Sequence, residues 1–240
     1  MLGFGYLGYL IFMLPALLFG LVAQMMVKTR FNRFSKVASQ KGITGAQAAE
    51  AVLRAGGVYN VRIGRVSGNL TDHYDPKTNS ISLSDSVYGS TSVAAIGVAA
   101  HEAGHALQYA QDYSPIKLRM SIVPVCNLGS KIGPLLIIIG CAISYGGMAA
   151  SESLGVALYL AGLILFCTVA LFQLVTLPVE LNASKRAMKA LSSSGALAKD
   201  ELGGARKVLT AAALTYVAAL VTAIFQILYY ASRFRPRDDR

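Results

Sequence analysis

Apolar residues gather in four long runs, at positions 2–27, 132–150, 154–177 and 208–230. The hydrocarbon core of a membrane is about 30 Å thick, and a helix rises about 1.5 Å per residue, so about 20 apolar residues cross it. Each run is close to that length. The pattern therefore predicts four transmembrane helices.

The residues that flank these runs give two further predictions. The second and third are joined by a short turn that contains Gly146, Gly147, Ser151 and Glu152, which predicts a helical hairpin. The first is followed directly by Lys28, Thr29 and Arg30. Because a small-residue cleavage site is missing there, we interpret this run as a retained anchor and not as a signal peptide.

The segment between the first two runs has a different pattern. Residues 44–56 predict a short amphipathic helix, with Thr44 as N-cap, Gln47 completing a capping box and Gly56 ending it. Alternating residues at 58–66 and 80–83 predict two strands, with a turn at 75–79. From Thr91 the chain predicts a helix that runs to about Asp112.

These elements divide the chain into six regions: helix 1 (1–27), a catalytic region (28–131), the hairpin (132–177), a polar segment (178–207), helix 4 (208–230) and a tail (231–240). The fold class that we predict is mainly α. It is a multi-pass membrane protein with about four transmembrane helices and a small α+β region of zincin type.

Composition supports this interpretation. Of the 240 residues, 54% are hydrophobic and 14% are charged, whereas soluble domains have about 25% charged residues. This excludes a disordered chain and an ordinary soluble enzyme.

The net charge of +10 raises the alternative of a nucleic-acid partner. However, Lys and Arg lie in the segments between the apolar runs, 12 of them in residues 28–131 and 6 in residues 178–207. Such clustering is typical of the positive-inside rule. We therefore expect a bilayer and no nucleic acid, with these segments on the cytoplasmic side. The Arg-rich tail at 231–240 argues the other way.

The candidate chemistry lies in the sequence His101-Glu102-Ala103-Gly104-His105. Two His at i and i+4 share one helix face and can bind one metal ion, and the intervening Glu can act on a water molecule. Zinc suits such a site, which needs a third protein ligand and keeps a fourth position open. We expect one Zn²⁺ per chain and Glu102 as the general base.

The third ligand must be a carboxylate, because the chain after His105 contains no further His. Asp112 is about two turns further along the same helix, which is too far. Glu180, Asp200 and Glu201 remain on the same side of the membrane. Glu180 follows Pro178 and is expected to begin a new helix beside the membrane, so we prefer it. Asp200 and Glu201 are expected at a solvated helix cap.

The sequence HEAGHALQ, together with LTDHYDP, SLSDSVYGSTSVAAIGVAA and LPVELNASKRA, resembles the YugP-like neutral membrane zinc metallopeptidases over essentially the whole chain. More distantly it is similar to membrane gluzincins of the HtpX and CaaX-prenyl-protease type. There a second helix supplies a Glu ligand, which favours Glu180. In that distant group an Asp four residues after the Glu steadies a His ligand, whereas Ser184 stands at this position here.

Three further features are candidates for substrate contact. His73 is either a donor to the transition state or a turn residue that ties the strand pair together, and we prefer the second. Arg186 either polarises the substrate carbonyl or is a surface charge. Residues 81–84 are a candidate edge strand for pairing with an extended substrate.

The resulting hypothesis is a membrane zinc endopeptidase that acts on peptides or membrane-associated proteins, in quality control or processing. A zinc-binding scaffold without activity and a site-2-type intramembrane protease are the alternatives. The second is disfavoured because the apolar run at 93–100 is too short to span a membrane.

Overall fold

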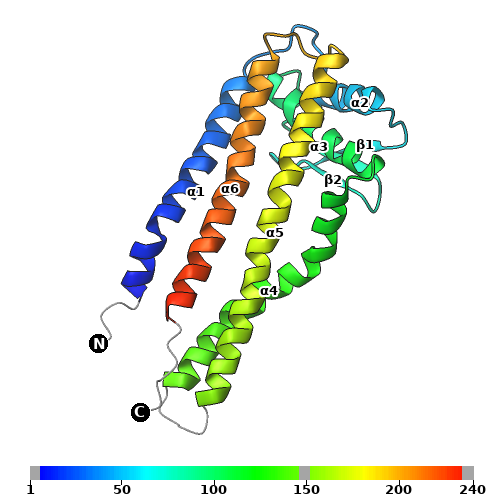
Figure 1. Ribbon diagram of the computed structural model, residues 1–240. Coiled ribbons are helices and arrows are strands. Elements are labelled where there is room, and N and C mark those ends of the chain that lie inside the picture. Colours follow the sequence, from blue (N-terminus) through cyan, green and yellow to red (C-terminus); the bar gives the residue numbers. More distant parts are fainter. Residues whose placement is uncertain (1–5, 146–151, 234–240) are drawn as a thin grey trace. The chain divides into compact units, whose positions relative to one another are not determined.

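The computed structural model describes residues 6–145 and 152–233, which form six helices and one three-stranded sheet (Figure 1). In chain order the elements are α1 (Tyr6–Phe34), α2 (Gly45–Ala55), β1 (Arg62–Val66), β2 (His73–Asp75), β3 (Ser80–Ser84), α3 (Val93–Ala110), α4 (Ser114–Tyr145), α5 (Glu152–Ser193) and α6 (Leu202–Arg233). The helices α1, α4, α5 and α6 are long and apolar enough to cross a membrane. The predicted fold class is therefore confirmed. The hairpin turn predicted at 146–151 and most of the predicted tail lie outside the described residues.

The long helices extend past the apolar runs that predicted them. α4 begins at Ser114, and α5 continues through Pro178 to Ser193. The prediction that Glu180 begins a new helix is therefore wrong. Proline removes one helical hydrogen bond, but Val179, Ala183, Ala187 and Leu191 are completely buried along one side of α5. Their packing stabilises the helix beyond the proline.

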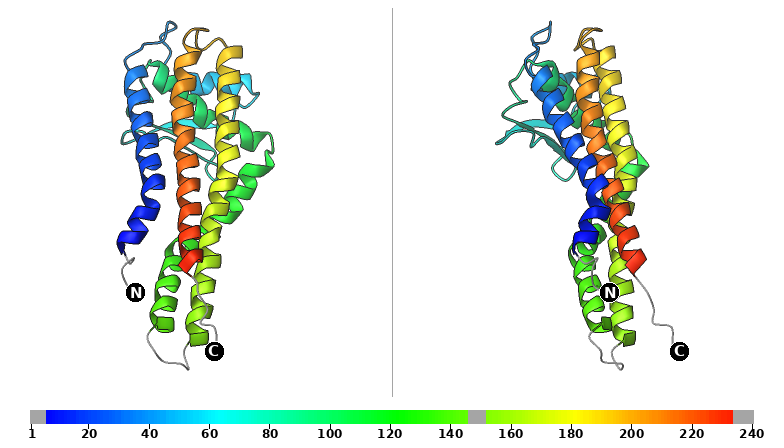
Figure 2. Two further views of the ribbon diagram at one scale, coloured as in Figure 1. Left: turned by 60° about the vertical axis from the view of Figure 1, so that its left-hand side comes forward. Right: turned by 90° about the vertical axis from the view of Figure 1, so that its left-hand side faces the viewer.

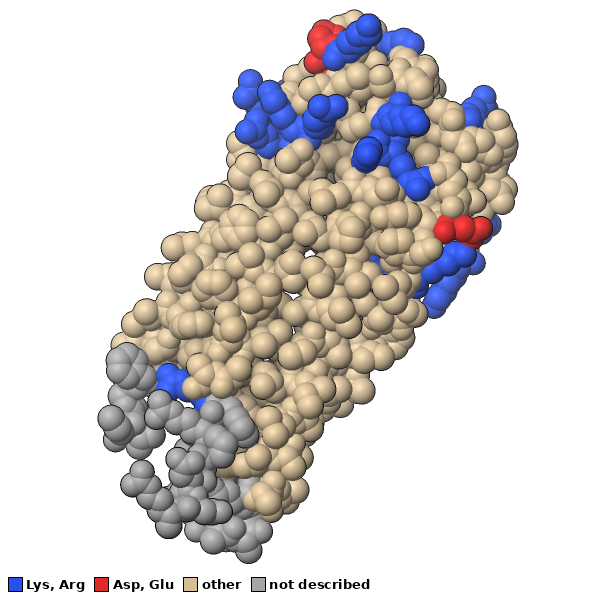
Figure 3. Space-filling model, in the orientation of Figure 1, with Lys and Arg blue, Asp and Glu red and all other residues tan. Residues whose placement is uncertain are grey.

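The chain forms two compact units. Unit 1 comprises Met1–Leu21, Leu118–Thr176 and Tyr216–Arg240. Within it, α4 and the first part of α5 run side by side (Figure 2). A Cβ atom on Gly162 would lie 2.7 Å from the carbonyl oxygen of Gly133, so small residues allow the two backbones the close approach common in membrane helix pairs. The face of unit 1 visible in Figure 3 is nearly free of charged residues.

Unit 2 comprises Val22–Lys117 and Leu177–Thr215 and contains the polar segments of the chain. Its core joins α2, α3 and the sheet to the adjoining parts of α1, α5 and α6. Helix α2 begins with the predicted capping box, in which Thr44 and Gln47 satisfy each other's backbone N–H groups. Ser92 caps α3 by accepting from the backbone of Ala95. Both helices are therefore confirmed.

The sheet of unit 2 has the order β1-β3-β2, with β1 parallel and β2 antiparallel to β3. Two predictions are wrong here. His73 lies in strand β2 and not in a turn, because the Asp75–Asn79 turn connects β2 with β3 as a hairpin. Residues 81–84 are not an edge strand, because β3 is central. The hydrogen-bonding groups at the end of β3 are also occupied, since the backbone N–H and the hydroxyl of Ser84 both donate to the carboxylate of Asp72.

Candidate metal centre

Helix α3 places both histidines and the intervening acid at the centre of unit 2. Fourteen of its 18 residues are buried, and they are mostly small and apolar. Against this background Glu102 (9% exposed) and His105 (8% exposed) are among the few buried polar side chains. A buried polar group without partners is costly, so each must be paired or serve a function.

Helix α5 reaches this site because Gly104 allows it to approach α3. A Cβ atom on Gly104 would clash with the carbonyl oxygen and the carbonyl carbon of Ala183. Glu180 lies one turn before Ala183 on α5 and is 2% exposed. The close contact of the two helices thus brings a carboxylate from residue 180 to the histidines of α3.

The donor atoms of the three side chains converge on one point. Glu180 Oε2 lies 3.1 Å from His101 Nε2 and 3.5 Å from His105 Nε2, and all three donors lie within 4.8 Å of one another. A tetrahedral zinc ion with bonds of about 2.0–2.2 Å holds its ligand atoms about 3.4 Å apart. Two imidazoles and one carboxylate at this spacing therefore fit zinc.

The ring of His105 is held in one tautomer. Its Nδ1 lies 3.0 Å from Gln108 Oε1, and Gln108 Nε2 donates to the carbonyl of Val179 and to Asn182 Oδ1 at 2.8 and 2.9 Å. Because a carbonyl only accepts, the amide of Gln108 must turn its oxygen to His105. His105 therefore carries its proton on Nδ1 when it is neutral, and the lone pair of Nε2 points to the cluster.

His101 has a similar outer partner. Its Nδ1 lies 3.0 Å from the hydroxyl oxygen of Ser184, one turn beyond Glu180 on α5. The hydroxyl oxygen can accept a hydrogen bond from Nδ1–H, which leaves the lone pair of Nε2 for the cluster. Ser184 therefore orients the ring of His101 from α5.

Without a cation, the neutral cluster would bring the Nε2 lone pair of His105 against a carboxylate oxygen. The pKa of His105 reflects this arrangement. Burial lowers it, but the hydrogen bond to Glu180 and the negative charges of Glu102 and Glu180 outweigh burial and raise the pKa above the ordinary value of 6.5. The site therefore favours a positive charge between its donor atoms, which a proton or a metal ion supplies.

Residues 9–235 match the family described as "putative neutral zinc metallopeptidase". The chain is also 44% identical over 218 residues to the protein named "Putative membrane protease YugP" of Bacillus subtilis (strain 168), covering 90% of this chain and 92% of that protein. The chain belongs to this zinc metallopeptidase family. No solved structure matches it. Zinc is accordingly the metal of the family, and His101, His105 and Glu180 form a group that can hold it.

The other two acids considered as ligands have different roles in this family member. Glu201 is buried and not solvated as predicted, because its carboxylate accepts from the backbone N–H groups of Gln40 and Ala198. Asp200 is exposed and accepts from the side chain of Gln40. Both acids thus hold the segment before α6, and neither belongs to the cluster.

The two candidate substrate contacts lie outside the cluster. His73 is exposed in β2 and its Nδ1 contacts the carbonyl of Thr71 at 2.9 Å. Arg186 is half-buried and not simply a surface charge. It donates to Asn182 at 2.7 Å and to Gln111, and its guanidinium lies 5.5 Å from the ring centre of Tyr113.

Sequence reasoning missed Gln108 and Asn182. Gln108 is completely buried and links His105 to Asn182, which in turn contacts Arg186. Its position three residues after His105 is a usable signal, since residues at i and i+3 are neighbours on a helix. The partner on α5 carries no comparable signal, because it depends on how the two helices pack.

Proposed function

We propose that this protein is a zinc endopeptidase of the membrane in which His101, His105 and Glu180 bind the metal and Glu102 is the general base. The observation that carries the proposal is the convergence of three donors from two helices, with both imidazoles held at Nδ1 by Ser184 and Gln108. Two neutral imidazoles and one carboxylate leave a tetrahedral zinc site with one open position, the arrangement of catalytic sites.

Bound zinc would supply Lewis acidity, lowering the pKa of a water molecule to about 7 and polarising the substrate carbonyl. The chain's own residues do the rest. Glu102 adjoins His101 on α3, and its carboxylate has no hydrogen bond or ion pair within residues 6–145 and 152–233. It is therefore free to accept the proton of the attacking water and to deliver it to the leaving amide nitrogen.

The substrate that we propose is a peptide segment of a membrane-associated protein, cleaved in processing or quality control. Strand β2 supports an extended substrate, because it pairs only with β3 among the described strands and contacts α3. Its outer edge is then the place for strand addition. We place this site on the cytoplasmic side, as the charge distribution of the segments indicates.

An intramembrane protease of site-2 type fits less well. Among the described residues, His101 and His105 lie on none of the four helices that are long and apolar enough to cross a membrane. A scaffold that only binds zinc is the remaining alternative, and it differs in one respect. A scaffold needs the three ligands but does not need Glu102.

The decisive experiment compares three substitutions of Glu by Gln in purified protein, measuring zinc per chain and cleavage of casein or of a membrane protein. Glu102→Gln is expected to keep its zinc and lose activity by about 10²–10⁴-fold, as for loss of a general base. Glu180→Gln is expected to lose zinc, because an amide is a poorer ligand than a carboxylate. Added zinc should restore part of its activity.

Glu201→Gln is the matched control, since Glu201 is a buried acid of the same unit whose carboxylate accepts from the backbone N–H groups of Gln40 and Ala198. It should keep both zinc and activity. Full activity of Glu102→Gln would show that Glu102 is not the base. Stoichiometric zinc with no cleavage by the wild-type chain would indicate the scaffold. Loss of zinc from Glu201→Gln, with zinc retained in Glu180→Gln, would show that the ligand assignment is wrong.

A further inference from the structure

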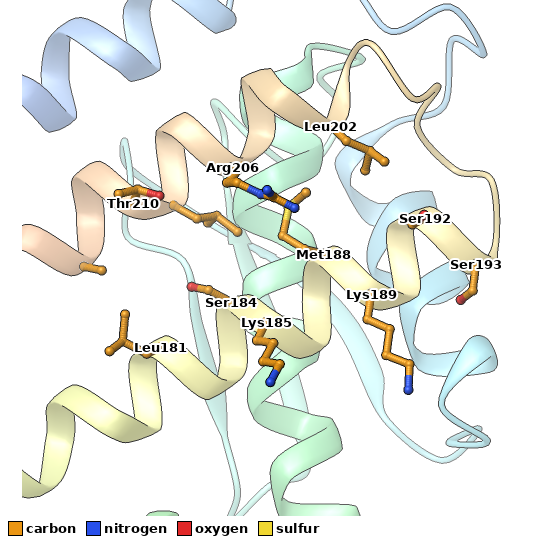
Figure 4. Close-up of a pocket in the computed structure, with 12 residues that line it drawn as sticks. Leu181, Ser184, Lys185, Met188, Lys189, Ser192, Ser193, Leu202, Arg206 and Thr210 are labelled. Atoms are coloured by element: carbon orange, nitrogen blue, oxygen red, sulfur yellow. The ribbon is translucent and has the colours of Figure 1, made fainter.

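A groove of about 670 Å³ lies between the ends of α5 and α6 that belong to unit 2 (Figure 4). This volume falls in the range of about 300–1,000 Å³ that is usual for small-molecule sites. Ser184 and Met188 are half-buried in it, and Thr210 of α6 lies opposite Ser184. None of the three proposed zinc ligands lines this groove, so it is distinct from the metal centre.

The charged side chains that line the groove are all positive. They are Lys185 and Lys189 of α5 and Arg206 of α6, and all three are exposed. The lining includes no acidic residue, and none of the three forms an ion pair with another residue of the described chain. Unit 2 as a whole shows many Lys and Arg and few Asp and Glu on the face in Figure 3. The groove therefore favours an anionic ligand.

The rest of the lining consists of hydroxyl and apolar residues, and the apolar ones adjoin the membrane-crossing stretches in the chain. Leu181, Leu209 and Ala213 line the groove together with Met188. On α5 the groove residues begin four residues after Leu177, where the apolar run ends. On α6 they lead from polar residues into the apolar run. A ligand that fits both parts has an anionic head and a hydrocarbon tail.

We propose that this groove binds an anionic phospholipid. Arg206 extends over the groove toward Met188 and contacts the phosphate headgroup. Lys185 and Lys189 extend from α5 away from α6 in Figure 4, and these exposed side chains attract the headgroup from the rim of the groove. The apolar residues contact the part of an acyl chain next to the headgroup. Basic pockets between transmembrane helices are a common form of lipid headgroup site. Long basic side chains at helix ends also reach the headgroup layer readily.

This site adjoins the metal centre through one residue. Ser184 lines the groove and contacts Nδ1 of His101. A lipid in the groove would therefore lie beside the α5 turn that orients His101. Lipid binding itself does not require the zinc, because no zinc ligand belongs to the lining.

The test is native mass spectrometry of the purified full chain in detergent, titrated with phosphatidylglycerol or with phosphatidylcholine of the same acyl chains. The wild-type chain is expected to prefer phosphatidylglycerol, before and after chelation of zinc. The triple variant Lys185→Gln/Lys189→Gln/Arg206→Gln should lose this preference, with affinity falling about fivefold for each charge removed.

The matched control is Lys36→Gln/Lys199→Gln/Lys207→Gln. It removes three exposed basic residues of the same unit that do not line the groove, and it should keep the preference. Zinc content and helical circular dichroism report whether each variant is folded. Equal loss in the two triple variants would show a general charge effect and overturn the proposal.

Fluorescence places the lipid without removing any charge. The chain contains no Trp, so Thr210→Trp introduces a single reporter in the groove. Brominated phosphatidylglycerol is expected to quench it more than brominated phosphatidylcholine does. Equal quenching by the two lipids would contradict the assignment. Full competition by soluble glycerol phosphate or by an acidic peptide, at the concentration at which the lipid saturates, would identify a phosphate or peptide site instead.

Discussion

Both imidazoles of the metal centre are fixed at their outer nitrogen, by Ser184 for His101 and by Gln108 for His105. These contacts hold the two rings in the orientation that points each Nε2 at the cluster before a metal ion binds. Outer partners of metal-bound His typically contribute 10–100-fold to metal affinity. Gln108 has the stricter geometry of the two, since its amide has further partners on α5.

We therefore expect Gln108→Met to weaken zinc binding by about 10–100-fold, measured by competition with a chromogenic chelator. Met has a similar volume, so the loss of the acceptor for Nδ1–H is the main change at His105. The variant also removes the two bonds that Gln108 Nε2 donates to α5, each of which contributes about 0.5–1.5 kcal/mol to the free energy of unfolding. Gln111→Met, an exposed change one turn later on the chain, is the control. Equal zinc affinity in the two variants would contradict the role of Gln108.

The raised pKa of His105 makes zinc binding dependent on pH in a definite direction. Protons compete with zinc for Nε2, so zinc affinity should fall by about tenfold per pH unit below this pKa. The stability of the metal-free protein has the opposite dependence on pH. Because its folded pKa lies above the ordinary value, protonated His105 stabilises the metal-free fold at low pH, and this contribution is lost as the pH rises through the folded pKa.

Thermal unfolding of the metal-free and the zinc-loaded chain, measured as the pH is raised from below 6.5 into the alkaline range, checks this sign. The metal-free chain should lose the His105 contribution toward high pH, and the zinc-loaded chain should not. His73→Ala is the control, since His73 is exposed in β2 and lies outside the cluster. It should leave both curves unchanged. A metal-free chain whose stability rises across this range would refute the assignment.

Among the secondary-structure elements, the site depends on the spacing of α3 and α5. Gly104 lies at the contact, where a Cβ atom would clash with the backbone of Ala183. Alanine has the better helix propensity by about 1 kcal/mol, but backbone atoms cannot move aside as a flexible side chain can. The clash should therefore outweigh the gain in propensity.

We expect Gly104→Ala to push the two helices apart and to reduce zinc content well below one per chain, together with a lower melting temperature. Gly203→Ala is the control, because a Cβ atom at Gly203 of α6 has no neighbour within 4 Å. It should be neutral or slightly stabilising. Stoichiometric zinc in Gly104→Ala, determined by elemental analysis, would show that the helix spacing does not set the site.

Local signals in the sequence predicted the elements that depend on neighbours in the chain. The capping box of Thr44 and Gln47 and the i, i+4 spacing of the histidines are such signals, and α2 and α3 have the expected bounds to within a few residues. Strand β2 was missed because turn-forming residues surround it and its pairing with β3 is a tertiary contact. The continuity of α5 through Pro178 was missed for the same reason, since distant packing decides it.

At the scale of the whole molecule, the apolar runs and the polar segments belong largely to different units. Unit 1 contains most of the apolar runs, whereas the metal centre and the α5–α6 groove both lie in unit 2. Composition along the sequence separates the same stretches, because apolar helices in lipid and a polar catalytic region need different residues. The third ligand could be chosen only by elimination and resemblance, since its position depends on how α5 returns to α3.

The orientation of the molecule in the membrane follows from the same division. With four membrane-crossing helices, residues 28–131 and 178–207 share one side, and they contain 18 of the 22 Lys and Arg residues. The remaining four lie at the C-terminal end. From the positive-inside rule we therefore expect the metal centre on the cytoplasmic side. Green fluorescent protein inserted near Gly195, between α5 and α6, should fluoresce, whereas alkaline phosphatase there should be inactive. At position 147, outside the described residues, the same two reporters should give the opposite result.

Replacing the four C-terminal Arg by Gln should leave this pattern unchanged, because the other side still has the larger positive charge. If the reporters at 195 and 147 exchange their behaviour, the protease would act on the outer face of the membrane, with the same ligands and the same base.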